Sequence, residues 1–136
     1  MTYSCPSFSI EVPNEAVDTS TYSFVIPVQE RFHPSVVIRR EPLPMKKTFS
    51  EYTAEQVPRM KAELKNFRLL RGPEEGAGRV VMSYEWGEGD AQFQQTQIYL
   101  DLGRSYYLLT LTQLAGSRVD HLPALGRIAS TFRPKA

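Results

Sequence analysis

The segment GRVVMSYEWGEGDAQFQQTQIYLDLGRSYYLLTLTQL, residues 78–114, decides the fold class of this chain. Three stretches within it, 78–86, 91–101 and 105–114, have the alternating or continuous apolar pattern of β-strands. Their connections, WGEGDA and DLGR, carry glycine and aspartate where a tight hairpin reverses the chain. Strands joined by hairpins are antiparallel, so the segment predicts a three-stranded antiparallel meander.

Period-two patterns predict further strands at 7–12, 20–28, 34–41 and 66–71. The stretch at 105–114 is apolar on both faces, which is typical of a central strand covered on two sides and also fits a sheet with one face that binds something apolar. Strands on both sides of a helix, without strict β–α alternation, favour an α+β fold with a mostly antiparallel sheet. The length of 136 residues suits a single domain over 1–136.

Residues 48–64 have side chains at helical spacing, and Thr48 with Glu51 forms the pattern of a capping box. Pro58 lies inside this segment, and an interior proline removes a backbone hydrogen bond. We therefore expect the helix to kink or restart near 55–57. A second helix is expected at 117–132.

Composition excludes several classes of protein. The 16 basic and 15 acidic side chains give a net charge of +1, which argues against a surface for nucleic acid or anionic lipid. Cys5 is the single cysteine, so no internal disulfide is expected. No stretch approaches the roughly 18 apolar residues of a membrane span, and the amino terminus does not have the pattern of a signal peptide. We expect a cytoplasmic protein that does not insert into the membrane.

Catalysis and metal binding receive little support. Only His33 and His121 accompany Cys5, without HExxH or CxxC spacing, so no catalytic residue, metal ligand or cofactor is predicted. The fragments GAG (76–78) and GEG (87–89) are interpreted as turns. The basic residues between 39 and 71 alternate with glutamates, which predicts solvated surfaces.

The glutamines of the segment 91–101 pose a question. Alternation places Phe93, Gln95, Gln97 and Tyr99 on one face of the strand. An amide in apolar surroundings is costly unless it is hydrogen-bonded. Gln56 occupies an apolar position of the first helix in the same way. Structural hydrogen bonding and contact with a ligand both remain open for these amides.

The order of motifs resembles the DcrB-like domain family, and more closely its branch of effector-associated (Eag) chaperones of bacterial type VI secretion. The stretches that carry the resemblance are, in chain order, DTSTYSFVIP (18–27), PSVVIRRE (34–41), SEYTAEQV (50–57), LKNFRLL (64–70), MSYEW (82–86), QTQIYL (95–100), YYLLTLT (106–112) and IASTFRP (128–134).

The resemblance implies a three-layer α/β/α sandwich with a curved antiparallel sheet, like the photosystem protein PsbP. It implies a homodimer that binds the hydrophobic amino-terminal transmembrane helices of a secreted effector before export. Glutamines on the helix and the strand hydrogen-bond to that client, and apolar side chains form the wall of the groove. These positions correspond to Gln56, Gln97, Met60, Leu64 and Phe93. Two more groove positions, usually apolar in the family, are Thr21 and Ser23 here.

The leading hypothesis is therefore a non-enzymatic chaperone or adaptor for apolar helices. The alternative is a domain of the same architecture without a secretion role, which binds a small ligand in a closed pocket between helix and sheet, or another protein. An enzyme is the least favoured of the three.

Overall fold

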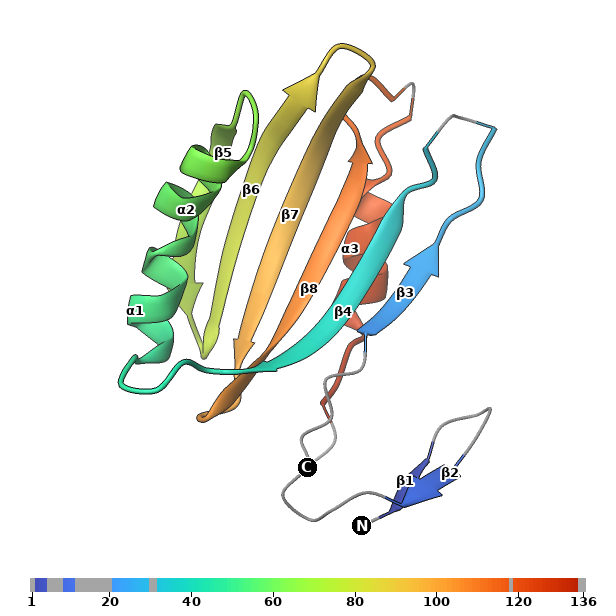
Figure 1. Ribbon diagram of the computed structural model, residues 1–136. Helices are drawn as coiled ribbons and strands as arrows, with labels where there is room; N and C mark the ends of the chain where they lie inside the picture. The colour runs from blue at the N-terminus through green and yellow to red at the C-terminus, as the bar shows by residue number, and fades with distance from the viewer. Residues whose placement is uncertain (1, 5–8, 12–20, 30–31, 118, 135–136) are drawn as a thin grey trace.

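The computed structural model describes residues 2–4, 9–11, 21–29, 32–117 and 119–134. Its main element is a six-stranded sheet in the order β3-β4-β8-β7-β6-β5, and every neighbouring pair is antiparallel (Figure 1). The strands are β3 (Thr21–Val25), β4 (Ser35–Pro42), β5 (Arg68–Gly76), β6 (Arg79–Glu88), β7 (Ala91–Asp101) and β8 (Ser105–Leu114). The predicted α+β class with an antiparallel sheet is confirmed, whereas the three-layer description and the likeness to PsbP stay predictions.

The three-stranded meander is present as predicted. Strands β6, β7 and β8 pair in sequence, and β8 lies between β7 and β4 in the interior of the sheet. Two short strands, β1 (Thr2–Ser4) and β2 (Ser9–Glu11), form a separate antiparallel pair. The strand expected at 7–12 falls partly on β2 and partly outside the described residues.

The first helical segment divides where the sequence predicts. Helix α1 (Phe49–Ala54) begins with the capping box, in which the Thr48 hydroxyl accepts a hydrogen bond from the Glu51 amide at 3.1 Å. Helix α2 (Gln56–Glu63) restarts after Glu55. Pro58 thus lies in the first turn of α2, where a backbone N–H has no partner within the helix and its loss costs little.

Helix α3 (Leu122–Ser130) is shorter than the predicted 117–132. The side chain of Gln113 accepts a hydrogen bond from the His121 amide at 2.7 Å, and Asp120 accepts one from the Leu122 amide at 3.1 Å. These bonds serve amides at the start of the helix that have no partner within it. Val119, which falls within the predicted helix 117–132, precedes the observed helix, and its side chain is 58% exposed.

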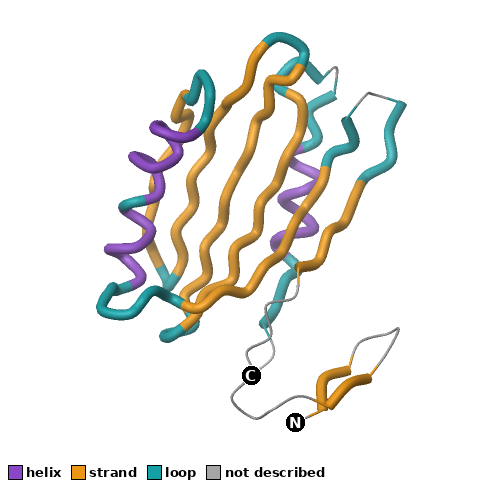
Figure 2. The backbone as a smooth tube through the Cα atoms, in the orientation of Figure 1, coloured by secondary structure: helices purple, strands orange, loops and turns teal. Residues whose placement is uncertain are grey.

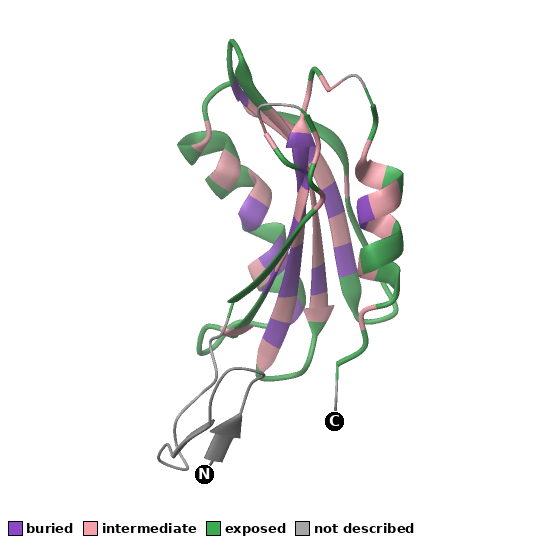
Figure 3. Ribbon diagram, turned by 90° about the vertical axis from the view of Figure 1, so that its right-hand side faces the viewer, coloured by how far each residue is buried: buried purple, intermediate pink, exposed green. Residues whose placement is uncertain are grey.

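Two hydrophobic cores lie on opposite faces of the sheet (Figure 3). Helices α1 and α2 lie over the β5–β6 side of one face, and α3 lies behind β8 and β4 on the other (Figure 2). The first core, the α1–α2 core, consists of Phe49, Val80, Met82, Tyr84, Tyr99, Tyr106 and Leu108. The second, the α3 core, consists of Val36, Ile38, Leu109, Leu111 and Leu125.

The two outer strands of the sheet differ. β5 has register shifts against β6 on both sides of Arg71, and Arg71 forms a bidentate pair with Glu74. Gly72 has φ +80°, and a Cβ there would lie 2.4 Å from the carbonyl oxygen of Val81, so only glycine fits. β3 pairs with β4 without a register shift, and its five residues are exposed.

Candidate functional site

The strand register decides which predicted site residues share a face. Partners in an antiparallel pair point to the same side of a sheet. Gln97 pairs with Thr110, Thr110 with Val37, and Val37 with Ser23, so these four residues form one line across β7, β8, β4 and β3. Gln97 also pairs with Met82 of the α1–α2 core. The whole line therefore belongs to the face that α1 and α2 partly cover.

The described helices leave the β8–β4–β3 part of this face uncovered (Figure 1). Small or hydroxylated side chains dominate it, several of them half-buried or exposed. We call this surface the open face; it consists of Thr21, Ser23, Val25, Ser35, Val37, Thr110 and Thr112, and the Arg39–Glu41 ion pair of β4 points to the same side. The predicted residues Thr21 and Ser23 lie on its outer strand, where both are exposed.

Gln56, Met60 and Leu64 belong to α2 and its carboxyl end, on the same side of the sheet as the open face. Gln56 is the first residue of α2, and its side chain is 9% exposed. Its amide nitrogen donates to the Tyr52 carbonyl at 3.0 Å, so this glutamine is bonded within its own helical segment. Met60 and Leu64 are half-buried and pack against the α1–α2 core.

Gln97 is half-buried and only partly satisfied by the protein. Its amide oxygen accepts a hydrogen bond from the Tyr99 hydroxyl at 2.6 Å. Within the described part of the chain, its amide nitrogen makes no hydrogen bond. Gln97 therefore has a structural role through its oxygen and keeps two N–H donors for another partner.

In Gln95, by contrast, both the oxygen and the nitrogen of the side-chain amide are hydrogen-bonded within the protein. Its oxygen accepts from the Trp86 indole N–H at 2.7 Å, and its nitrogen donates to the Thr112 hydroxyl at 2.9 Å. These two bonds join β6, β7 and β8 through side chains. Sequence reasoning left the role of the amides open, and for Gln95 the structure answers with internal hydrogen bonding.

Phe93 belongs to an aromatic cluster at one end of the open face. Its ring lies edge-on to Phe32, with 5.1 Å between centroids, and is tilted against Trp86 at 5.4 Å. Such geometries are favourable for aromatic pairs. The half-buried Phe93 thus joins the strand β7 to the segment that precedes β4.

A chain of hydroxyl groups lies at the opposite end. The Tyr52 and Tyr106 hydroxyls are 2.7 Å apart, and Tyr106 donates to the Glu41 carboxylate at 2.9 Å. Burial raises the pKa of Tyr84, Tyr99 and Tyr106, and for Tyr106 the hydrogen bonds to Tyr52 and Glu41 raise it further. These tyrosines stay protonated at neutral pH and act as hydrogen-bonding groups.

The basic residues between 39 and 71 form exposed ion pairs, in agreement with the prediction of solvated surfaces. These pairs are Arg39–Glu41, Lys47–Glu55, Arg59–Glu63, Lys65–Glu88, Arg68–Glu85 and Arg71–Glu74. In the part of the chain that the structure describes, no three His, Cys, Asp or Glu residues gather as a metal site. None of the described helices is long and apolar enough to cross a membrane.

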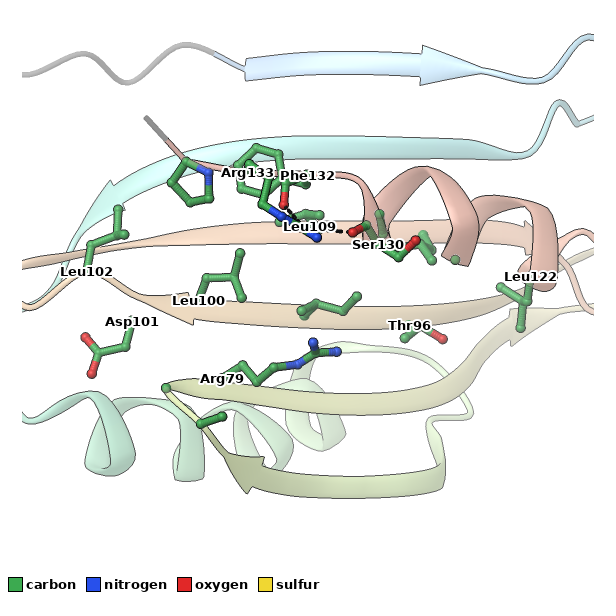
Figure 4. Close-up of a pocket in the computed structure, with 17 residues that line it drawn as sticks. Arg79, Thr96, Leu100, Asp101, Leu102, Leu109, Leu122, Ser130, Phe132 and Arg133 are labelled. Carbon is green, nitrogen blue, oxygen red and sulfur yellow. Dashed lines mark hydrogen bonds between the residues drawn. The ribbon is translucent and has the colours of Figure 1, made fainter. Parts of the chain in front are cut away.

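A cavity of about 630 Å³ lies on the other face, between α3 and strands β6–β8 (Figure 4). We call it the α3 cavity. Its lining is Ala77, Gly78, Arg79, Thr96, Ile98, Leu100, Asp101, Leu102, Leu109, Leu111, Leu122, Gly126, Ala129, Ser130, Phe132, Arg133 and Pro134. Sequence reasoning missed this site. The sequence does contain a signal for it: Ile98 and Leu100, which follow Thr96 on the same face of β7, are both aliphatic.

The family model for DcrB matches residues 8–131. The chain belongs to the DcrB family. The crystal structure of a Pseudomonas aeruginosa protein of unknown function, named as a candidate regulator, is similar with a TM-score of 0.80 and 21% sequence identity. The similarity covers all of this chain and 97% of that one, and at this identity it shows a shared fold alone. No curated protein matches the sequence. The Eag assignment within the DcrB family is a proposal.

Proposed function

We propose that this DcrB-family chain is an Eag-type chaperone or adaptor of type VI secretion. Its client is the hydrophobic amino-terminal transmembrane segment of an effector, held on the open face before export. The observation that carries the proposal is the line Gln97–Thr110–Val37–Ser23, which brings the predicted strand glutamine and an outer-strand position onto one face of the sheet, part of which the described helices leave uncovered. Gln56, Met60 and Leu64 lie on the same side of the sheet.

The side chains of the open face suit a transmembrane helix. Small and hydroxylated residues let two backbones approach closely, as they do between helices in a bilayer. Thr110, Ser35 and Ser23 offer hydroxyls without bulk. A helix laid on this floor would meet the half-buried Met60 and Leu64 at one side. The surface therefore combines close packing with apolar contact.

Gln97 gives such a complex its register. Its amide nitrogen has no hydrogen-bond partner among the described residues, and the side chain lies on the same face of the sheet as Thr110 and Ser23. A polar group within an apolar interface favours one position of the client over positions shifted along its axis, because the others leave the amide unpaired. Gln56 has its amide nitrogen bonded to Tyr52, so its contribution to a client is its oxygen, which can accept.

Co-expression tests the proposal. The chain is produced together with the amino-terminal segment of an effector whose gene lies beside its own, and soluble complexes are separated by size-exclusion chromatography. We expect the segment to remain soluble and to elute with the chain. A segment that stays insoluble, with no complex in solution, overturns the proposal.

A pair of variants on one strand assigns the binding face. Ser23→Arg adds a charge to the open face, and Phe24→Arg adds the same charge one residue later, on the opposite face of β3. Both side chains are exposed, so both variants should fold. We expect Ser23→Arg to abolish complex formation and Phe24→Arg to preserve it. If both variants lose complex formation to the same extent, the client does not bind on the open face.

We also propose the family's three-layer, PsbP-like description and a homodimer for this chain. Helices packed on opposite faces of one sheet support the layered description. The outer strand β3, which has an unshifted register with β4 and five exposed residues, offers an edge for association of two copies. Sedimentation equilibrium tests the dimer, and a monomer at micromolar concentration contradicts it.

A further inference from the structure

We propose that the α3 cavity binds an amphiphile with a linear apolar chain and one anionic head group, such as a long-chain carboxylate. This site lies on the face of the sheet opposite to the open face, so it is independent of the client site. The volume of about 630 Å³ is within the usual range of roughly 300–1,000 Å³ for small-molecule sites.

The floor of the cavity is apolar and elongated. Ile98, Leu100 and Leu102 contribute to the lining from β7 and the turn after it, and Leu109 and Leu111 contribute from β8. The stretch from Thr96 to Leu102 spans about 20 Å at the rise of a β-strand. Figure 4 shows these side chains distributed from Leu122 at one end to Leu102 at the other. A straight aliphatic chain matches this shape.

Helix α3 leaves room for such a chain. Leu125 turns into the core, while Gly126 and Ala129 face the cavity. A Cβ at Gly126 would meet no atom within 4 Å. These small residues leave space between α3 and the sheet that larger side chains would fill.

Two arginines line the cavity between Leu102 and Leu122, on opposite sides of it (Figure 4). Arg79 begins β6, and its side chain extends along the cavity on the side away from α3 (Figure 4). It forms no ion pair or hydrogen bond with any described residue. Arg133 is held at the end of α3, where its guanidinium donates to the Ser130 and Phe132 carbonyls at 2.8 Å.

The acidic side chain of the lining, Asp101, lies beside Leu102 at one end of the cavity (Figure 4). Asp101 lines the cavity, but its carboxylate accepts a hydrogen bond from the Gly103 amide at 2.8 Å in the β7–β8 turn. Two arginines and this one carboxylate give the lining a net positive charge. A carboxylate head between Arg79 and Arg133, with its chain directed toward Leu122, satisfies both the charge and the apolar floor.

Titration calorimetry with the full chain tests the proposal. Dodecanoate, below its critical micelle concentration, is compared with dodecanol and with butyrate. We expect dodecanoate to bind to one site, dodecanol to bind about tenfold more weakly because it forms no charged hydrogen bond, and butyrate not to bind. Absence of dodecanoate binding overturns the proposal, and equal affinity for dodecanol overturns the anion site.

Three variants locate the site. Arg79→Gln should weaken dodecanoate about tenfold and leave dodecanol within twofold, while Arg127→Gln, an exposed arginine of α3 outside the lining, should change neither. Gly126→Leu should fill the cavity and abolish binding of both. Its melting temperature should equal or exceed that of the unmodified chain, since glycine is a poor helix former. Unchanged binding in a folded Gly126→Leu variant contradicts the assignment.

Discussion

The two faces of the sheet are built from the same strands, yet they differ in chemistry. On the α1–α2 face, β7 contributes Gln95, Gln97 and Tyr99, all with side-chain hydrogen bonds. On the α3 face the same strand contributes Ile98 and Leu100, which line a cavity. Each face is partly covered, and the helices cover different strands. A period of two thus lets one strand supply two different binding surfaces.

The largest effects should come from the two cores. Met82 and Leu125 are both 0% exposed, one in each core. We expect Met82→Ala and Leu125→Ala each to lower the free energy of unfolding by about 2–5 kcal/mol, because a buried side chain is replaced by a cavity. Urea denaturation measures both. Hydrogen exchange should show local opening of α3 in Leu125→Ala only; opening of α3 in Met82→Ala as well would remove the distinction between the faces.

Alkaline pH should affect the α1–α2 face first. The pKa of Tyr84, Tyr99 and Tyr106 is raised in the folded protein, so the neutral hydroxyl is favoured there. The stabilisation is complete below the unfolded pKa of about 10 and is lost as pH rises above it. Above that pH, each tyrosine lowers the free energy of unfolding by about 1.4 kcal/mol per pH unit.

Fluorescence of Trp86, the single tryptophan, follows this transition from the same face. Tyr84→Phe should move the midpoint to higher pH, since it removes one titrating group. An unchanged midpoint would mean that other residues cause the loss of stability at alkaline pH.

Gln95→Leu should have the next largest effect. It leaves the Trp86 indole and the Thr112 hydroxyl without their partner, and unpaired groups of this kind cost about 1–3 kcal/mol when buried. Thermal denaturation measures the loss. Gln94→Leu is the neighbouring control on the other face, where Gln94 accepts from Gln113, which also bonds Asp120 and the His121 amide. A loss for Gln94→Leu as large as that for Gln95→Leu would contradict the special role of Gln95.

The smallest effect should come from a double change at Gln97 and Tyr99. Gln97→Leu alone leaves the buried Tyr99 hydroxyl unpaired and should cost about 1 kcal/mol. Adding Tyr99→Phe removes both partners, and stability should return to within about 0.5 kcal/mol of the unmodified chain. Client binding should be weakened in both variants. Full binding by the double variant would show that the Gln97 amide does not contact the client.

The sequence predicted local structure well where the chain itself carries the signal. The hairpins of 78–114, the capping box of Thr48 and the break before Pro58 depend on neighbouring residues, and all are present. The start of α3 was misplaced because the side chains of Gln113 and Asp120 fix it, and Gln113 comes from β8. Periodicity alone cannot identify such a contact.

The candidate site was only partly predictable, for a similar reason. Alternation placed Gln95 and Gln97 on one face, but their different roles depend on Trp86, Thr112 and Tyr99, which the register brings within hydrogen-bonding distance. The α3 cavity required the relative position of α3 and β6. Arg79 has no motif around it that indicates a binding residue.

The two outer strands, β5 and β3, differ in structure, and this difference limits how many copies of the chain could join their sheets edge to edge. β5 is bulged on both sides of Arg71, carries the Arg71–Glu74 pair and contains Pro73, which donates no hydrogen bond, so another strand cannot easily join it. β3 has an unshifted register with its neighbour and exposed side chains. A second molecule that joined at β3 would leave only its own β5 side outward. The assembly would therefore stop at a pair, and the sheet cannot extend into a fibre.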